Sequence, residues 1–233
     1  MLLFILVSIC FGEVDSDIFF QRIVIGQTEL KRDIVVEQFG DGEEVVSIIS
    51  TIHGNEAIGT PLLFRFLKQE KMKGLEDKTV FILYVANPDG YVSNMRGNAN
   101  NIDLNRNFPT ENFGRGVFNG EAPLTAIESS VLLDFLQRYQ PDRTLIIHQP
   151  LNGIDYDGKS KELAEYLSAE SDVRIKRLGS RSGSMGTYLG LHLKKQVITL
   201  EIPERYSDEP IDLVCEKYCV LFEKFIAYSP TQE

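Results

Sequence analysis

The sequence contains no tryptophan, only three histidines and only three cysteines. So few cysteines form no obvious disulfide framework. Cys10 lies near the N-terminus, whereas Cys215 and Cys219 lie four residues apart in a predicted helix and therefore share a face. We expect these two to be packed free thiols rather than a disulfide or a metal-binding pair. Cysteine usage does not decide the redox compartment.

Positive charge is also scarce. The chain has 24 lysines and arginines against 34 aspartates and glutamates, which gives a formal net charge of -10. An acidic surface repels phosphate backbones and anionic headgroups, so nucleic acid and anionic membranes are poor candidate partners. Any carboxylate of a substrate would have to be bound by a local cluster of arginines.

Long hydrophobic runs are missing as well. The first twelve residues are almost wholly apolar and an acidic stretch follows them, but a membrane span needs about 20 apolar residues. The run has the length of a signal-peptide core, although no lysine or arginine precedes it. We treat residues 1–17 as a candidate signal peptide or N-terminal segment. An exported, periplasmic protein is expected if it is a signal peptide, with no stable membrane insertion after its removal, and a cytoplasmic protein otherwise.

The remaining chain, residues 18–233, contains no repeat, low-complexity tract or linker, which favours one domain. Apolar strand patterns alternate with amphipathic helical patterns, so we predict an α/β fold: a mixed, mostly parallel β-sheet with helices on both faces. Expected strands are 33–39 (an edge strand), 45–52, 79–85, 144–148 and 196–201. Expected helices are 58–73, 125–139, 159–171 and 212–227. The long polar loop 91–123 is expected to be functional.

Potential metal ligands follow two of the predicted strands. His53 and Glu56 come directly after strand 45–52, and His148 ends strand 144–148. The carboxyl ends of parallel strands meet at one edge of a sheet, where sites gather. Imidazole and carboxylate groups bind zinc, and a catalytic zinc site typically has three protein ligands and water. The third histidine, His192, is expected to be packed or at the surface.

Glu201 ends a third predicted strand. A carboxylate in such a place must find a hydrogen-bond partner or shift its pKa. Beside a zinc-activated water it could act as the general base that takes a proton during attack on a carbonyl. A structural salt bridge to an arginine is the competing interpretation, which the three neighbouring ligands make the weaker one.

The loop 95–109 supplies cations and amides. Arg96 and Arg106 flank it, and Asn105 precedes the second arginine. The planar fork of an arginine suits a carboxylate, and a second arginine could stabilise an oxyanion. Asp103 is expected to orient the loop or its arginines rather than to bind metal.

Together these elements resemble the M14 family of zinc carboxypeptidases. The resemblance is carried by His-Gly-Asn-Glu at 53–56, Asn-Pro-Asp-Gly at 87–90, Asp-Leu-Asn-Arg-Asn-Phe at 103–108, the strand-end His148 and Thr-Leu-Glu-Ile-Pro at 199–203. It implies that His53, Glu56 and His148 hold one zinc ion per chain and that Glu201 is the catalytic glutamate.

The resemblance also implies the roles of substrate-binding residues. Arg96 matches the arginine that polarises the scissile carbonyl, and Asn105 and Arg106 match the pair that holds the terminal carboxylate. Ser184 and Met185 lie in the segment that lines the specificity pocket, where small residues leave room for a sizeable side chain. The substrate-binding tyrosine of many members has no convincing counterpart, because the nearest, Tyr188, does not align with it.

The chain is short and resembles the compact bacterial branch of the family, which includes murein peptide amidases. This implies a peptide substrate, with cleavage at a γ-D-glutamyl–diaminopimelate bond. Arg177 and Arg181 are hypothesised to meet additional carboxylates, and solvated loop charges are the competing interpretation. The alternatives are a general carboxypeptidase for L-amino acids, a zinc deacylase of the aspartoacylase type, and a binding module without activity.

Overall fold

The computed structural model describes residues 20–69 and 77–229. The strands are β1 (Phe20–Gln27), β2 (Asp33–Phe39), β3 (Glu44–Ile49), β4 (Lys78–Leu83), β5 (Arg143–His148), β6 (Gly153–Asp157) and β7 (Gln196–Glu201). The helices are α1 (Gly59–Gln69), α2 (Pro88–Ser93), α3 (Ile127–Tyr139), α4 (Lys161–Ser171), α5 (Met185–Thr187) and α6 (Ile211–Ala227). Residues 1–17, with the predicted leader and Cys10, and the end of the predicted helix 58–73 lie outside the described residues.

The strands form one seven-stranded sheet in the order β1-β2-β4-β3-β5-β7-β6. Its centre is parallel, because β3 pairs with both β4 and β5, and β5 pairs with β7. The edges are antiparallel. The predicted mixed, mostly parallel sheet is therefore confirmed. The register places His148 of β5 beside Glu201 of β7, so two of the predicted site residues end adjacent strands.

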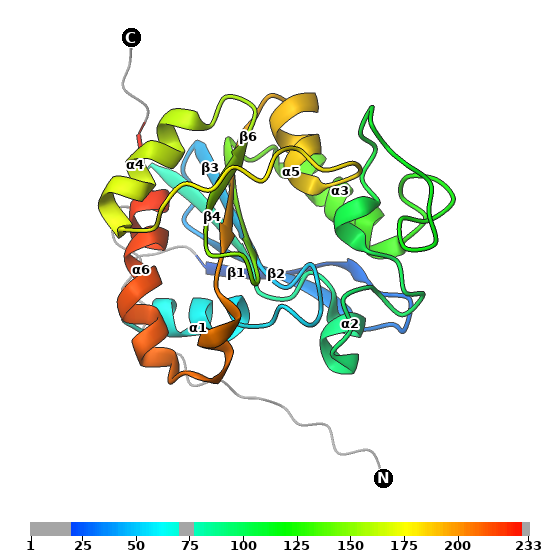
Figure 1. The fold of residues 1–233 in the computed structure, drawn as a ribbon, viewed down its shortest axis with the longest axis horizontal. Helices are drawn as coiled ribbons and strands as arrows, with labels where there is room; N and C mark the ends of the chain where they lie inside the picture. The colour runs from blue at the N-terminus through cyan, green and yellow to red at the C-terminus, as the bar shows by residue number, and fades with distance from the viewer. Residues whose placement is uncertain (1–19, 70–76, 230–233) are drawn as a thin grey trace.

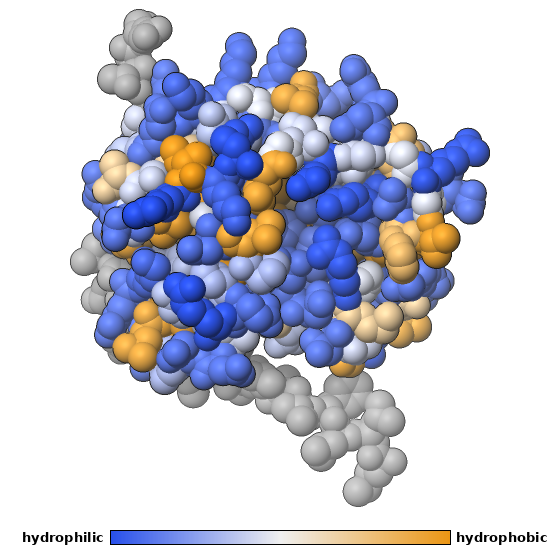
Figure 2. All heavy atoms as spheres, viewed as in Figure 1, coloured by the Kyte–Doolittle hydropathy of each residue, from blue (hydrophilic) through white to orange (hydrophobic). Residues whose placement is uncertain are grey.

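Helices cover both faces of the sheet (Figure 1). One apolar core lies between the sheet and helices α1, α4 and α6. The other lies between the sheet and α3, together with α5 and the helical turn Tyr188–His192 that follows it. Every residue of β4 and β5 is buried, which is typical of strands covered on both faces. In the view of Figure 2, hydrophilic side chains cover most of the surface and apolar side chains form separate patches. No helix in the described part of the chain has the length and apolarity to cross a membrane.

Two strands escaped the sequence prediction, and both lie at the edges of the sheet. β1 flanks β2, so the prediction that 33–39 is an edge strand is wrong. Most of β1 is exposed or half-buried, which weakens its apolar pattern. β6 was missed because it carries Asp155 and Asp157 where an apolar run would be expected. Both aspartates are nevertheless buried.

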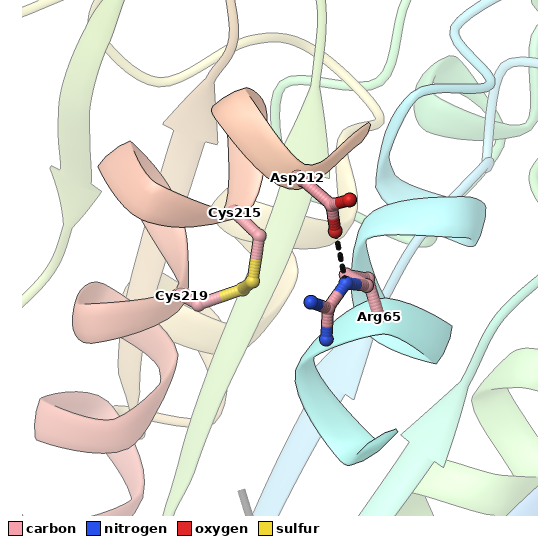
Figure 3. Close-up of a disulfide and its surroundings, with 4 residues drawn as sticks. All are labelled: Arg65, Asp212, Cys215 and Cys219. Atoms are coloured by element: carbon pink, nitrogen blue, oxygen red, sulfur yellow. Dashed lines mark hydrogen bonds and ion pairs between the residues drawn. A yellow bond between two sulfur atoms is a disulfide. The ribbon is translucent and has the colours of Figure 1, made fainter. Parts of the chain in front are cut away.

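The prediction of free thiols at Cys215 and Cys219 is also wrong. They share a buried face of α6, as expected, but form a disulfide with Cα atoms 4.8 Å apart (Figure 3). Residues four apart on a helix lie one above the other, so their sulfur atoms can meet. Next to them, Arg65 of α1 pairs with Asp212 at the start of α6. Both contacts lie where α6 packs on α1.

A buried arginine joins the opposite end of α6 to the sheet. Arg143 of β5 is 1% exposed; its Nε donates to the carbonyl of Phe225 at 2.9 Å and its Nη2 to that of Ile226 at 2.8 Å. Its Nη1 pairs with Glu44 of β3. A cation at the C-terminus of a helix satisfies the last carbonyl groups and complements the helix dipole.

Replacing this arginine should therefore destabilise the fold. For Arg143→Met we expect the free energy of unfolding to fall by about 3 kcal/mol, because buried carbonyl groups lose their donors. Urea denaturation followed by circular dichroism measures the change, with the exposed Arg115→Met as the control. Equal stability of the two variants would contradict the structural role of Arg143.

Candidate metal centre and active site

Three buried side chains meet at the carboxyl edge of the parallel strands. His53 follows β3, Glu56 lies in the turn before α1, and His148 ends β5; they are 3%, 8% and 4% exposed. Nδ1 of His53 lies 2.8 Å from Oε1 of Glu56, and Nδ1 of His148 lies 2.8 Å from Oε2. One ligand atom from each residue can be chosen so that all lie within 4.8 Å of one another. The structure thus brings together the three predicted metal ligands.

The backbone between His53 and Glu56 requires a glycine. A Cβ atom on Gly54 would lie 2.0 Å from the carbonyl carbon of Gly90, so only glycine allows this turn to pack against α2. The side chain of Asn87 accepts a hydrogen bond from the Gly90 N–H and caps α2. The predicted turn at 87–90 is therefore the start of a short helix, and this helix packs against the loop that carries His53.

The outer nitrogen of each histidine has its own partner. Nε2 of His53 lies 3.0 Å from Oδ1 of Asp103, and Nε2 of His148 lies 3.1 Å from Nδ2 of Asn105. Both Nδ1 atoms are left facing Glu56. Nδ1 of His53 is buried and, despite its short distance to Glu56, forms no hydrogen bond of acceptable geometry. Buried polar atoms are normally satisfied, and a metal ion would satisfy this one.

The charges of the centre also suit a cation. Burial disfavours ionisation of Glu56, but the hydrogen bond with His148 and the close charge interaction with His53 outweigh it, so the pKa of Glu56 lies far below its usual value. The pKa of Asp103 is likewise lowered, because its hydrogen bond with His53 outweighs burial. In the same way the two carboxylates raise the pKa of His53 against the effect of its burial. The same negative charges would favour a divalent cation between these side chains.

The predicted substrate-binding residues surround this centre. Arg96 donates from Nη1 to Oε1 of Glu56 and from Nε to Oδ2 of Asp103, each at 2.9 Å. Oδ1 of Asn105 accepts the backbone N–H of Met185 at 2.9 Å. Burial, followed by repulsion from other arginines, lowers the pKa of Arg106 although Asp103 opposes this. The prediction that Asp103 orients an arginine is confirmed, and it orients His53 as well.

Glu201 stands beside the metal centre without a salt bridge. Its side chain is almost fully buried, and Oε2 accepts the backbone N–H of Leu151 at 3.1 Å. Within residues 20–69 and 77–229 it has no ion pair. The competing interpretation of Glu201 as half of a structural salt bridge therefore finds no support in the geometry.

A cavity of about 210 Å³ joins these groups. Of the residues predicted for the site, His53, Glu56, Arg96, Asn105, Arg106, His148, Ser184 and Glu201 line it. Met185 does not: its side chain lies in the core, and only its N–H serves the site, through Asn105. Tyr188 is buried behind the site, 6.0 Å from Phe108 between ring centroids, and His192 is exposed, as expected.

Two further charged residues line the cavity that the sequence reasoning missed, Asp155 and Asp157 of β6. Their alternation around Tyr156 was the available signal, since it places both on one face of a strand. The two arginines of the 177–181 segment behave differently. Arg177 donates to Oδ1 of Asp155 at 2.6 Å and its guanidinium lies 3.6 Å from the centroid of the Tyr156 ring, whereas Arg181 lines the cavity.

Known proteins resemble this chain in sequence. The family model of zinc carboxypeptidases matches residues 15–201. Murein peptide amidase A of Escherichia coli K12 is 29% identical over 167 residues, which are 64% of this chain and 66% of the relative, just under two thirds of its length. The catalytic chain of human carboxypeptidase N is 33% identical over 117 residues, 38% of this chain and 26% of the relative.

Solved structures share the fold. The murein-tripeptide amidase of Escherichia coli O157 superposes with a TM-score of 0.75 at 23% identity, covering 91% of this chain and 93% of that chain. The carboxypeptidase A of Helicoverpa armigera gives a TM-score of 0.75 at 20% identity, covering 89% and 67%. The predicted fold is thus the carboxypeptidase fold of these proteins.

The contact between Asp103 and His53 can be tested by metal titration. For Asp103→Asn we expect zinc affinity to fall about 10- to 100-fold, because the histidine loses its charged orienting partner. Competition with a chromophoric chelator measures the affinity, and Asp134→Asn, on the exposed side of α3, is the matched control. If Asp103→Asn binds zinc as tightly as the control, Asp103 does not orient the ligand.

Proposed function

The chain belongs to the zinc carboxypeptidase family, and from that premise we propose that it hydrolyses C-terminal amide bonds with one zinc ion held by His53, Glu56 and His148. The observation that carries this proposal is the convergence of these three groups, with one unsatisfied histidine nitrogen, beside the carboxylate of Glu201. Zinc in this place would supply Lewis acidity for a carbonyl group and lower the pKa of a water molecule.

Glu201 is the proton carrier in this proposal. The N–H of Leu151 fixes its Oε2, while its Oε1 accepts no hydrogen bond from the described residues and is left to take a proton. The carboxylate removes a proton from the attacking water and delivers it to the leaving amine, as a general base and then a general acid. The register of β5 and β7 keeps it beside His148 throughout.

The loop 95–109 holds the substrate. Met185 fixes the amide of Asn105 so that its Nδ2 can donate, and the guanidinium of Arg106 has no carboxylate partner among the described residues. These two groups bind the terminal carboxylate of the substrate. Arg96 is half exposed, and its Nη2 donates to no described residue, so it can stabilise the oxyanion of the scissile carbonyl.

The proposed substrate is a murein peptide cut between γ-D-glutamate and diaminopimelate. Two relatives with this fold are named for activity on murein peptides, and the solved one is matched over almost its whole length. The cavity contains both acidic and basic side chains, as an amino acid with charges of both signs requires. A general carboxypeptidase that releases lysine or arginine is the second candidate, which the aspartates of β6 favour. The family match favours both over a deacylase.

Export is a separate proposal for residues 1–17. N-terminal sequencing of the protein isolated from its cells tests it. A chain that begins near Glu13 would support removal of a signal peptide, and a chain that retains Met1 would contradict it.

A cleavage assay distinguishes the substrates. We expect mass spectrometry to show release of diaminopimelate from L-Ala-γ-D-Glu-diaminopimelate, loss of this activity with a zinc chelator, and no cleavage of simple L-peptides. Cleavage of L-peptides ending in lysine or arginine, with the murein tripeptide intact, would instead favour the general carboxypeptidase. No cleavage by zinc-loaded protein would contradict both.

The role of Glu201 predicts a separation of binding from turnover. Glu201→Gln should bind zinc as the wild type does and lose about 10²- to 10⁴-fold in kcat, since general acid–base catalysis contributes that much. The matched control is Glu204→Gln, an exposed glutamate three residues further along. A Glu201→Gln variant with the kcat of the control would assign the proton transfer to another group.

A further inference from the structure

The aspartate at the end of β6 is a buried carboxylate with one free oxygen. Asp157 is 7% exposed and lines the cavity. Its Oδ1 accepts the hydroxyl of Ser180, but its Oδ2 accepts no hydrogen bond from the described residues. A Cβ atom on residue 186 would lie 2.8 Å from this oxygen, so Gly186 keeps it open to the cavity. Burial raises the pKa of Asp157 and repulsion from Asp155 adds to this, which outweighs the opposing effects of the Ser180 hydroxyl and of Arg177.

The neighbouring aspartate is already neutralised. Arg177 donates to Asp155 and to the carbonyl of Tyr156, and it stacks on the Tyr156 ring. The hypothesis that Arg177 meets a carboxylate of the substrate therefore loses its basis, because this guanidinium is held by the protein. Because Arg177 pairs with Asp155, Asp157 has no ion pair among the described residues, like Glu201 in the same cavity.

Arg181 differs from Arg177, because no carboxylate of the described residues pairs with it. The backbone carbonyl of Arg181 is fixed, since it accepts the N–H of Ser184 at 3.1 Å and the hydroxyl of Thr187 at 2.8 Å. Arg181 lines the cavity, and its guanidinium forms no ion pair within the described parts of the chain. It also lies close enough to Arg106 to lower the pKa of that residue. A bound anion would relieve this repulsion.

We propose that Asp157 and Arg181 together recognise the far end of the side chain of the released amino acid, where an ammonium and a carboxylate sit on one carbon. This inference rests on the proposed function and assigns its specificity. Asp157 binds the ammonium, Arg181 binds the distal carboxylate, and Asn105 and Arg106 hold the terminal carboxylate. Diaminopimelate has this chemistry, lysine has only the ammonium, and alanine has neither group.

The two charges can be separated with three substrates that differ only in the last residue: L-Ala-γ-D-Glu peptides ending in diaminopimelate, lysine or alanine. Arg181→Met should lose about 10- to 100-fold in kcat/KM on the diaminopimelate peptide, the range of one charge-assisted hydrogen bond, and keep its rate on the other two. Asp157→Asn should lose a similar factor on both the diaminopimelate and the lysine peptides. Arg174→Met, at an exposed arginine that precedes this segment and does not line the cavity, is the control.

Equal losses on all three peptides, or no loss on any, would overturn the assignment. Calorimetric binding of free diaminopimelate and free lysine provides a second readout that needs no turnover. Diaminopimelate should bind at least about tenfold more weakly to either variant than to the control, and unchanged binding would overturn the inference. If the wild-type protein cleaves none of the peptides but binds diaminopimelate through these residues, the proposed reaction fails while the recognition site stands.

Discussion

The functional site depends on one carboxylate, Glu56, held between two histidines. Its two oxygens lie 2.8 Å from Nδ1 of His53 and 2.8 Å from Nδ1 of His148. Burying a carboxylate is costly unless it is paired, so this arrangement requires that both histidines arrive with the same nitrogen facing inwards. The parallel centre of the sheet meets this requirement by ending β3 and β5 side by side. Asp103 and Asn105 then occupy the outer nitrogens and fix both rings.

The same sheet edge gathers positive charge in an acidic protein. The net charge is -10, yet Arg96, Arg106 and Arg181 all line one cavity of about 210 Å³. Arg96 is balanced by Glu56 and Asp103, whereas Arg106 and Arg181 have no carboxylate partner among the described residues. In the proposed function, these two guanidinium groups supply the local positive charge that the net charge of the protein does not. Asp157 adds one free anion, so the cavity presents both signs to the substrate.

Most of the fold and the convergence of the candidate metal ligands could be predicted because the relevant signals are local. The buried strands are apolar runs, and His53, His148 and Glu201 stand directly at or after their ends. The parallel pairing of such strands then determines that the residues meet. The family resemblance added the roles of Arg96 and Arg106, which the residues alone left open.

The features that sequence reasoning missed arise from contacts between distant segments. β6 carries aspartates because it faces the cavity and an arginine, so no apolar run marked it. Met185 was expected to line the pocket, but its side chain packs in the core while its N–H orients Asn105. The bond between Cys215 and Cys219 depends on the approach of two sulfur atoms, which helical spacing permits and does not require.

The most direct measurement of the central claim is X-ray absorption at the zinc edge of the zinc-loaded protein. The account predicts scattering from two imidazole rings, with nitrogen and oxygen ligands at about 2.0–2.1 Å and no sulfur. A sulfur shell at about 2.3 Å, or a spectrum without imidazole scattering, would contradict it, because the metal would then lie away from His53, Glu56 and His148.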